Sequence, residues 1–498
     1  MTNTTEWITR SVSRLRSGAP STDKAPKASK PAADKPLADK QVADGAATKV
    51  PAPRSTHERL QATLRRGNES LSPRALRRLL ADLQDVVAPQ VSELEGGRRA
   101  QVVAGWYGQA EPEERRDMWL LLCEQFAPDA TRFQSARQRY EAAAGTADEG
   151  QAEISLRRAL VSPRTRLMQR FAVFPEGMRF LVDLRAELLP QLKSDKRLVA
   201  LDADLEHLFT TWFDVAFLEL RRLSWDSPAS LIEKLIKYEA VHDIRSWADL
   251  KNRLDSDRRC YGFFHPRLPN EPLIFVEVAL VDSISSSITP LLDEAAAPTD
   301  ISRASTAIFY SISNTQTGLR GVSFGDSLIK HVVETLCAEF PRLRTFATLS
   351  PIPGFRAWLG KNAPAMLNRF SDKQRAELAR EVGAEPLQAP ALLAAADKAL
   401  ALEPKSALRQ WLLQCAAHYL ARELPDGKPI DPVARFHLGN GARVERLNWA
   451  GDPSSKGQKQ SYGLMVNYLY DLKRLDKHRE LLSQGKIPVA PAISELFF

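Results

Sequence analysis

The chain has 498 residues, of which 44% are apolar and 26% charged, and its net charge is +8. This length exceeds what one hydrophobic core supports, so we expect two or three domains. The composition excludes a membrane-spanning protein, because no apolar run approaches the roughly 18 residues of a span. The first residues also lack the apolar region of a secretory signal.

The positive charge is concentrated at the N-terminus. Residues 1–55 contain ten Lys or Arg and five Asp or Glu, so a surplus of only three positive charges remains on the other 443 residues. Nucleic-acid binding calls for a basic face with interleaved aromatics, or for a known module, and the sequence shows neither. We therefore expect no nucleic-acid partner.

Cysteine and histidine spacing argues against a metal site. The four cysteines are far apart, and the eight histidines form no ligand-type spacing such as HExxH. Reduced, buried thiols in a cytoplasmic protein are the expected state of Cys123, Cys260, Cys337 and Cys415. The C-terminal "ISELFF" is not a peroxisomal tripeptide, which also favours the cytoplasm.

Residues 1–55 are rich in Ala, Pro and Lys and nearly free of large apolar groups, so we predict a disordered tail. Its opening "WITRSVSRLRSG" resembles a targeting peptide, but the acids that follow favour a tail or a partner-binding arm.

Residues 56–205 have helical periodicity throughout. One helix is predicted in "LSPRALRRLLADLQDVV", with Ser72 as its cap and Pro73 at its first position. The segment "PEERRDMWLLLCEQF" repeats the pattern, with acids at its start that favour the helix dipole. Further helices are expected at residues 151–161, 165–173 and 176–192. We interpret this region as a helical bundle that packs against another subunit.

Residues 206–498 alternate strand-like and helical runs, which predicts a mixed α/β or α+β layer structure. A helix is expected at residues 326–340, and a helical insert at about 371–424. Strands are expected at residues 273–281, 306–313, 342–349 and 463–472.

The stretch "TLSPIPGFRAWLG" holds Ser350 in a stiff turn. A residue before proline is forced into extended backbone, and Gly354 permits a bend into a following helix. A small hydroxyl at a strand end suits a site residue, because little further ordering is needed when a ligand binds. The alternative is that the turn is only a rigid connection.

A glycine-rich loop follows the strand "TAIFYSIS" and precedes an amphipathic helix. Glycines let the backbone approach a phosphate, so this loop suits a pyrophosphate, although it lacks the lysine and hydroxyl of a P-loop. The alternative is a plain turn. The residues we assign to the loop are Gly318, Arg320, Gly321, Val322, Ser323 and Gly325.

This order of strand, loop, helix and strand resembles the core of GNAT-type acetyltransferases, which bind coenzyme A. Three blocks together resemble malonyl-CoA decarboxylases more closely: "YSISNTQTGLRGVSFGDSLIKHVV", "FPRLRTFATLSPIPGF" and "FHLGNGARVERLNWAGDPSSKGQKQSYGLMVNYLY". The resemblance covers about residues 60–498. It implies an α+β protein: an N-terminal all-α helical bundle at 56–205 that mediates oligomerisation, followed at 206–498 by a GNAT-like mixed β-sheet domain with helices on both faces.

The resemblance also implies site residues and an activity. Ser350 and His437 match the family's catalytic serine and histidine, and Ser311 and Tyr470 match further positions of the site. Ser323 stands where the family has an acidic residue, which leaves the role of that position open. The implied reaction converts malonyl-CoA to acetyl-CoA and carbon dioxide in a homo-oligomer, either a dimer or a tetramer.

The chemistry needs no metal, biotin, pyridoxal phosphate or thiamin diphosphate, because the thioester carbonyl absorbs the charge as an enolate. Ser350 would orient the carboxylate, and His437 would stabilise the enolate or protonate it. Two alternatives remain: a GNAT-type N-acyltransferase that uses acyl-CoA, and a non-catalytic scaffold that binds coenzyme A.

Overall fold

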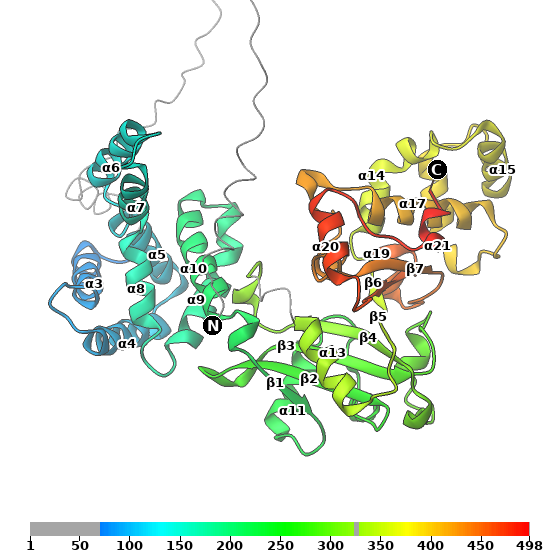
Figure 1. Cartoon of the computed structure of the whole chain (residues 1–498), viewed down its shortest axis with the longest axis horizontal. Coiled ribbons are helices and arrows are strands. Elements are labelled where there is room, and N and C mark those ends of the chain that lie inside the picture. The colour runs from blue at the N-terminus through cyan, green and yellow to red at the C-terminus, as the bar shows by residue number, and fades with distance from the viewer. Residues whose placement is uncertain (1–69, 323–327, 498) are drawn as a thin grey trace, which may run out of the picture. The chain divides into compact units, whose positions relative to one another are not determined.

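The structure is a computed structural model that describes residues 70–322 and 328–497. The predicted N-terminal tail lies outside the described residues, as do Ser323 and Gly325 of the glycine-rich loop. Element labels follow Figure 1.

The first described region is entirely helical (Figure 1). The Ser72 side chain accepts a hydrogen bond from the amide of Ala75, and Pro73 occupies the first turn, as predicted. Ser92 and Ser162 cap two further helices in the same way. The helices are α3 (Pro73–Val86), α4 (Glu93–Gln109), α5 (Pro112–Gln125), α6 (Ala130–Ala143), α7 (Glu149–Leu160), α8 (Pro163–Phe171), α9 (Gly177–Leu188) and α10 (Val199–Trp212).

An eight-stranded mixed sheet follows, in the order β1-β2-β3-β4-β5-β8-β6, with β7 paired to β8. All pairs are antiparallel except β4 and β5, which run parallel. The strands are β1 (Glu219–Leu223), β2 (Arg258–His265), β3 (Leu268–Val281), β4 (Thr306–Asn314), β5 (Thr345–Thr348), β6 (Ser350–Pro351), β7 (Arg443–Asn448) and β8 (Met465–Leu469).

Both faces of this sheet are covered. Successive side chains of a strand point to opposite faces, so Phe309 of β4 packs in the main core with α13, while its neighbours Ile308 and Tyr310 join a second cluster. On β2, Phe264 packs with Ile232 of α11 in a third cluster. The sheet is therefore buried between layers, as its nearly continuous apolar strands require.

The remaining helices lie between or after the strands. The helices that lie among the first strands are α11 (Ala229–Tyr238) and α12 (Trp247–Arg253). Those that follow β4 are α13 (Leu328–Glu339), α14 (Phe355–Leu367), α15 (Asp372–Val382), α16 (Ala389–Ala396), α17 (Ala407–Ala421), α18 (Pro432–Gly439), α19 (Ser455–Ser461), α20 (Leu475–Ser483) and α21 (Pro491–Ser494). A short 3-10 turn, η7 (Thr317–Leu319), begins the glycine-rich loop.

The predicted fold class, a helical region followed by a mixed sheet with helices, is confirmed. The prediction missed four strands, namely β1, β2, β6 and β7. The strand expected over residues 342–349 is shorter, since β5 begins at Thr345. Of the helices in the described ranges, none has the length and apolar character needed to cross a bilayer.

Candidate active site

Ser350 lies where the chain passes from one strand pairing to another. β5 pairs in parallel with β4 as far as Thr348, whereas Ser350 in β6 pairs with Val466 of β8. The proline that follows cannot donate a ladder hydrogen bond, which limits β6 to two residues. Ser350 is 5% exposed, so its hydroxyl is held inside the protein.

A chain of hydrogen bonds connects Ser350 to His437 and Tyr470. Ser350 Oγ lies 3.2 Å from His437 Nε2 and 2.9 Å from Thr348 Oγ1. On the other side of the ring, His437 Nδ1 lies 2.7 Å from the hydroxyl of Tyr470. The ring also stacks on Tyr468, with centroids 4.7 Å apart. Residues from β5, β6, α18 and the end of β8 thus meet at one imidazole.

Burial keeps this imidazole neutral. His437 is 3% exposed, and its removal from water lowers its pKa to about 3. Burial likewise raises the pKa of Tyr470, so its phenol keeps its proton. A neutral imidazole has one donor and one acceptor nitrogen. With Tyr470 donating to Nδ1, the proton of the ring lies on Nε2 and is directed at Ser350 Oγ.

These side chains border a cavity of about 470 Å³. Ser311, Ser350 and His437 all line it, whereas Tyr470 does not and lies behind the imidazole. Arg435, an exposed residue of α18, also lines the cavity, and its guanidinium donates to the carbonyl oxygen of Pro429. The other lining residues are Val241, Ile274, Phe309, Tyr310, Ile312, Asn314, Val322, Leu328, Pro351, Pro432, Val433, Phe436, Gly439 and Asn440.

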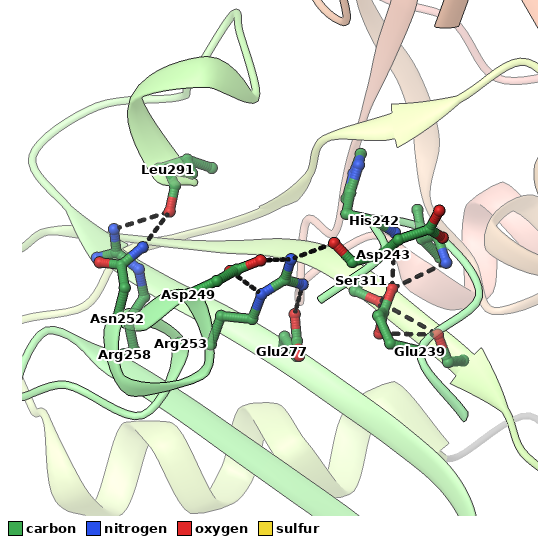
Figure 2. A network of polar contacts seen from close by, with 12 residues as sticks. Glu239, His242, Asp243, Asp249, Asn252, Arg253, Arg258, Glu277, Leu291 and Ser311 are labelled. Carbon is green, nitrogen blue, oxygen red and sulfur yellow. Dashed lines mark hydrogen bonds and ion pairs between the residues drawn. The ribbon is translucent and has the colours of Figure 1, made fainter. Parts of the chain in front are cut away.

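Ser311 is held by a carboxylate that the sequence analysis did not single out. Its Oγ lies 2.8 Å from each carboxylate oxygen of Glu239, the residue that ends α11 (Figure 2). Glu239 stands in "KYEAVHD", which reads as the ordinary end of an amphipathic helix, so no local signal marks it. Tyr468 also gains its role only through a contact distant in sequence, its stacking on His437, whereas Thr348 lies two residues before Ser350.

The described part of the glycine-rich loop packs on α9. A Cβ atom at Gly318 would lie 1.9 Å from the carbonyl oxygen of Val182, so only glycine fits there. Arg185 of α9 donates to the carbonyl oxygens of Gly318 and Arg320, at 2.8 and 2.9 Å. Gly321 has a φ of +84°, which favours glycine. The loop is thus anchored to the helical region.

The cysteines form no disulfides among themselves and differ in burial. All four cysteines are free; Cys260 and Cys415 are buried, while Cys123 and Cys337 are half-buried. The expectation that all four are buried therefore holds for two of them. Within residues 70–322 and 328–497, no group of three or more His, Cys, Asp or Glu side chains is arranged to hold a metal ion.

A buried hydroxyl and a neutral imidazole that share a cavity, beside a mixed sheet, are typical of an enzyme active site. The family profile described as the malonyl-CoA decarboxylase C-terminal domain matches residues 216–497, and that of the N-terminal domain matches residues 126–213. The chain belongs to the malonyl-CoA decarboxylase family.

Individual relatives agree with this assignment. The mitochondrial malonyl-CoA decarboxylase of Rattus norvegicus is 37% identical over 404 residues, which cover 76% of this chain and 80% of the rat protein. The crystal structure of malonyl-CoA decarboxylase from Rhodopseudomonas palustris is 42% identical with a TM-score of 0.72, covering 84% of this chain and 99% of that one. The Cupriavidus metallidurans enzyme is 43% identical with a TM-score of 0.69, covering 85% and 100%.

Proposed function

We propose that this protein is a carboxy-lyase that converts malonyl-CoA to acetyl-CoA and carbon dioxide. Family membership supports the substrate and the reaction, since the relatives named above are malonyl-CoA decarboxylases. The single structural observation that supports it most is the pair formed by Ser350 and His437, 3.2 Å apart at the edge of one cavity.

In the proposed reaction, the bond between the α-carbon and the carboxylate of the malonyl group breaks. Its electron pair moves toward the thioester carbonyl and forms an enolate, carbon dioxide leaves, and a proton that comes ultimately from solvent is added to the α-carbon. Ser350 orients the carboxylate as a neutral hydroxyl. A lysine or arginine in its place would stabilise the carboxylate charge and oppose its loss.

His437 stabilises the enolate as a neutral hydrogen-bond donor. Its pKa of about 3 means that an imidazolium is not present near neutral pH. The Nε2 proton, held on that nitrogen by the Tyr470 hydrogen bond to Nδ1, is shared between Ser350 Oγ and the enolate oxygen once substrate is bound. Tyr470 therefore acts through His437 and fixes its tautomer.

The coenzyme A portion is proposed to bind at the glycine-rich loop and the cavity mouth. Gly318, Arg320, Gly321 and Val322 form the described part of the loop, and Ser323 and Gly325 belong to the same proposal. Val322 connects loop and cavity because it lines the latter. Arg435, exposed at the cavity, offers its positive charge to phosphate groups. The reaction itself requires no cofactor, since the thioester is the electron sink.

The test is to incubate purified protein with malonyl-CoA in the absence of any amine acceptor. We expect acetyl-CoA and carbon dioxide in equal amounts, detected by chromatography and by carbon dioxide release. The Ser350→Ala protein serves as the control and should form both products far more slowly. Unchanged malonyl-CoA, with saturable binding, would favour the non-catalytic scaffold, and acyl transfer only after an amine is added would favour the N-acyltransferase.

The low pKa of His437 predicts the pH profile. An ordinary histidine would give kcat/KM an inflection near pH 6.5. Because the His437 imidazole stays neutral down to about pH 3, we expect no such inflection between about pH 5 and 8. The measurement is kcat/KM for malonyl-CoA across that range. A loss of activity on acidification with a midpoint near 6.5 that persists in a His265→Asn control would contradict a neutral donor.

Assembly and location complete the proposal. We propose a homo-oligomer, either a dimer or a tetramer, formed through the helical region at about 56–205. It is supported by exposed apolar side chains there, among them Val102 at 75% and Leu94 at 63% exposure. A cytoplasmic location remains our proposal, supported by the four free thiols, whereas the rat relative is named a mitochondrial protein.

A further inference from the structure

The carboxylate of Glu239 is surrounded by hydrogen-bond donors. Its Oε1 accepts hydrogen bonds from the backbone amides of Val241 and His242, both at 2.8 Å. The Ser311 hydroxyl lies 2.8 Å from both oxygens, and the Ser313 hydroxyl lies 3.1 Å from Oε2. A carboxylate that receives two amides and two hydroxyls acts as an acceptor toward every one of them.

The direction of the Ser311 hydrogen bond follows from this arrangement. A hydroxyl has one proton to donate, and Ser311 donates it to Glu239, a contact dashed in Figure 2; its Oγ also lies 3.2 Å from that of Ser313. Ser313 accepts the amide of Ala240 and also donates to Glu239, but it does not line the cavity. Ser311 does line it, so what Ser311 offers to a ligand is a lone pair.

The surroundings of Ser311 are unfavourable for the reacting carboxylate. Phe309 and Thr348 are the last paired residues of the parallel strands β4 and β5, and Ser311 and Ser350 each lie two residues beyond them. Ser311 remains in β4, whereas Ser350 lies in β6 and pairs with β8, and both residues line the cavity. Glu239 places a negative charge next to the hydroxyl of Ser311, which repels a substrate carboxylate. Ser350, whose described partners are Thr348 and His437, has no such neighbour among them.

We infer that Glu239 is a positioning residue that makes Ser311 a hydrogen-bond acceptor for the coenzyme A arm. The matching ligand group is an amide N–H of the pantetheine chain, which is present in substrate and product alike. This inference rests on the proposed function and goes further, because it assigns Ser311 to the arm and leaves the malonyl carboxylate to Ser350 and His437.

Glu239 also shapes the cavity wall. Its hydrogen bonds to the amides of residues 241 and 242 fold the turn after α11, and Val241 of that turn lines the cavity. From the other side, Lys456 of α19 donates to the carbonyl oxygens of Ala240 and Val241, each at 2.9 Å. The turn is therefore fixed at both its amides and its carbonyls.

The experiment compares Ser311→Ala with Ser313→Ala, a matched pair on the same strand and the same carboxylate. The readouts are the Kd of acetyl-CoA by calorimetry, and KM and kcat for malonyl-CoA. Loss of one acceptor should raise both Kd and KM about 3- to 10-fold in Ser311→Ala, with kcat nearly unchanged. Ser313→Ala should leave both constants within about twofold.

Glu239→Gln tests the positioning role. The glutamine amide is isosteric but replaces one acceptor oxygen by an NH2 donor, so the Ser311 hydroxyl can accept from it and present its proton to the cavity. We expect Kd for acetyl-CoA to rise as in Ser311→Ala, with no further rise in the double variant. Glu277→Gln is the control, because Glu277 is buried in the same network and hydrogen-bonds Arg253, but it does not line the cavity.

The outcomes are distinguishable. If Ser311→Ala raises KM for malonyl-CoA but not the Kd of acetyl-CoA, then Ser311 donates to the carboxylate and the inference is wrong. The same holds if neither constant changes, or if kcat alone falls. If the wild-type protein neither binds acetyl-CoA nor releases carbon dioxide, the proposed function fails, and the inference fails with it.

Discussion

Replacing His437 with asparagine should lower kcat for malonyl-CoA decarboxylation at least about 100-fold while KM changes little. One preorganised donor to a developing oxyanion contributes about 3–4 kcal/mol to the transition state, and asparagine cannot place a donor at the Nε2 position. Under the proposed function, the loop and the cavity walls contribute most of the substrate binding, so binding should persist. Steady-state kinetics with malonyl-CoA measures both constants.

The matched control for this variant is His265→Asn. His265 is also buried, and its Nδ1 accepts the backbone amide of Arg267, but it does not line the cavity. Its replacement should leave kcat within about threefold, because it affects packing only. A His437→Asn protein with near wild-type kcat and an unchanged melting temperature would remove the imidazole from the mechanism.

The second large effect is on stability. Arg253 is fully buried; it bonds Asp249 at 2.7 Å and Glu277 at 3.1 Å (Figure 2). Burial and the nearby Glu239 charge raise the pKa of Glu277 to about 8, while Arg253 opposes the rise. Arg253→Met leaves these carboxyl groups without their cation, which should cost about 3–5 kcal/mol. Urea unfolding monitored by circular dichroism measures the change.

The pH dependence of this loss has a defined sign. Below its raised pKa, Glu277 is protonated and carries no charge. Arg253→Met should therefore lower the free energy of unfolding less at about pH 6 than at about pH 8.5. Arg137→Met is the control, since Arg137 and its partner Glu141 are 56% and 58% exposed and such pairs contribute at most about 1 kcal/mol. Equal losses for the two variants would mean that the buried network is not stabilising.

The helices and the apolar strands could be predicted from the sequence, because their patterns are local. Ser72 and Pro73 mark the start of α3, and the β-branched and aromatic runs mark β3 and β4. The strands β1, β2 and β7 carry arginines at positions where an apolar residue would be expected. Arg259 of β2, for instance, is buried because Glu339 of α13 pairs with it, a contact 80 residues away.

In the candidate site, too, some residues could be found from the local sequence and others only from long-range contacts. Ser350 could be singled out from the local sequence because prolines follow it, whereas His437 and Tyr470 were identified only through resemblance to a family. The pairing of Ser350 with His437 spans 87 residues, and that of Ser311 with Glu239 spans 72. No local pattern encodes such contacts, so Glu239 could be recognised only once the chain was folded.

The hydrogen bonds from Arg185 to the turn at Gly318 affect whether the chain can be cut into independent fragments. Two carbonyl oxygens of the turn are satisfied by an arginine that belongs to the N-terminal family segment, and the close approach at Val182 leaves no room for a substitute side chain. A fragment that begins at residue 216 would keep Ser350 and His437 yet lose the arginine that hydrogen-bonds the start of the glycine-rich loop. The conformation of this loop therefore depends on a residue from each of the two family segments, so the sheet segment does not fix it alone.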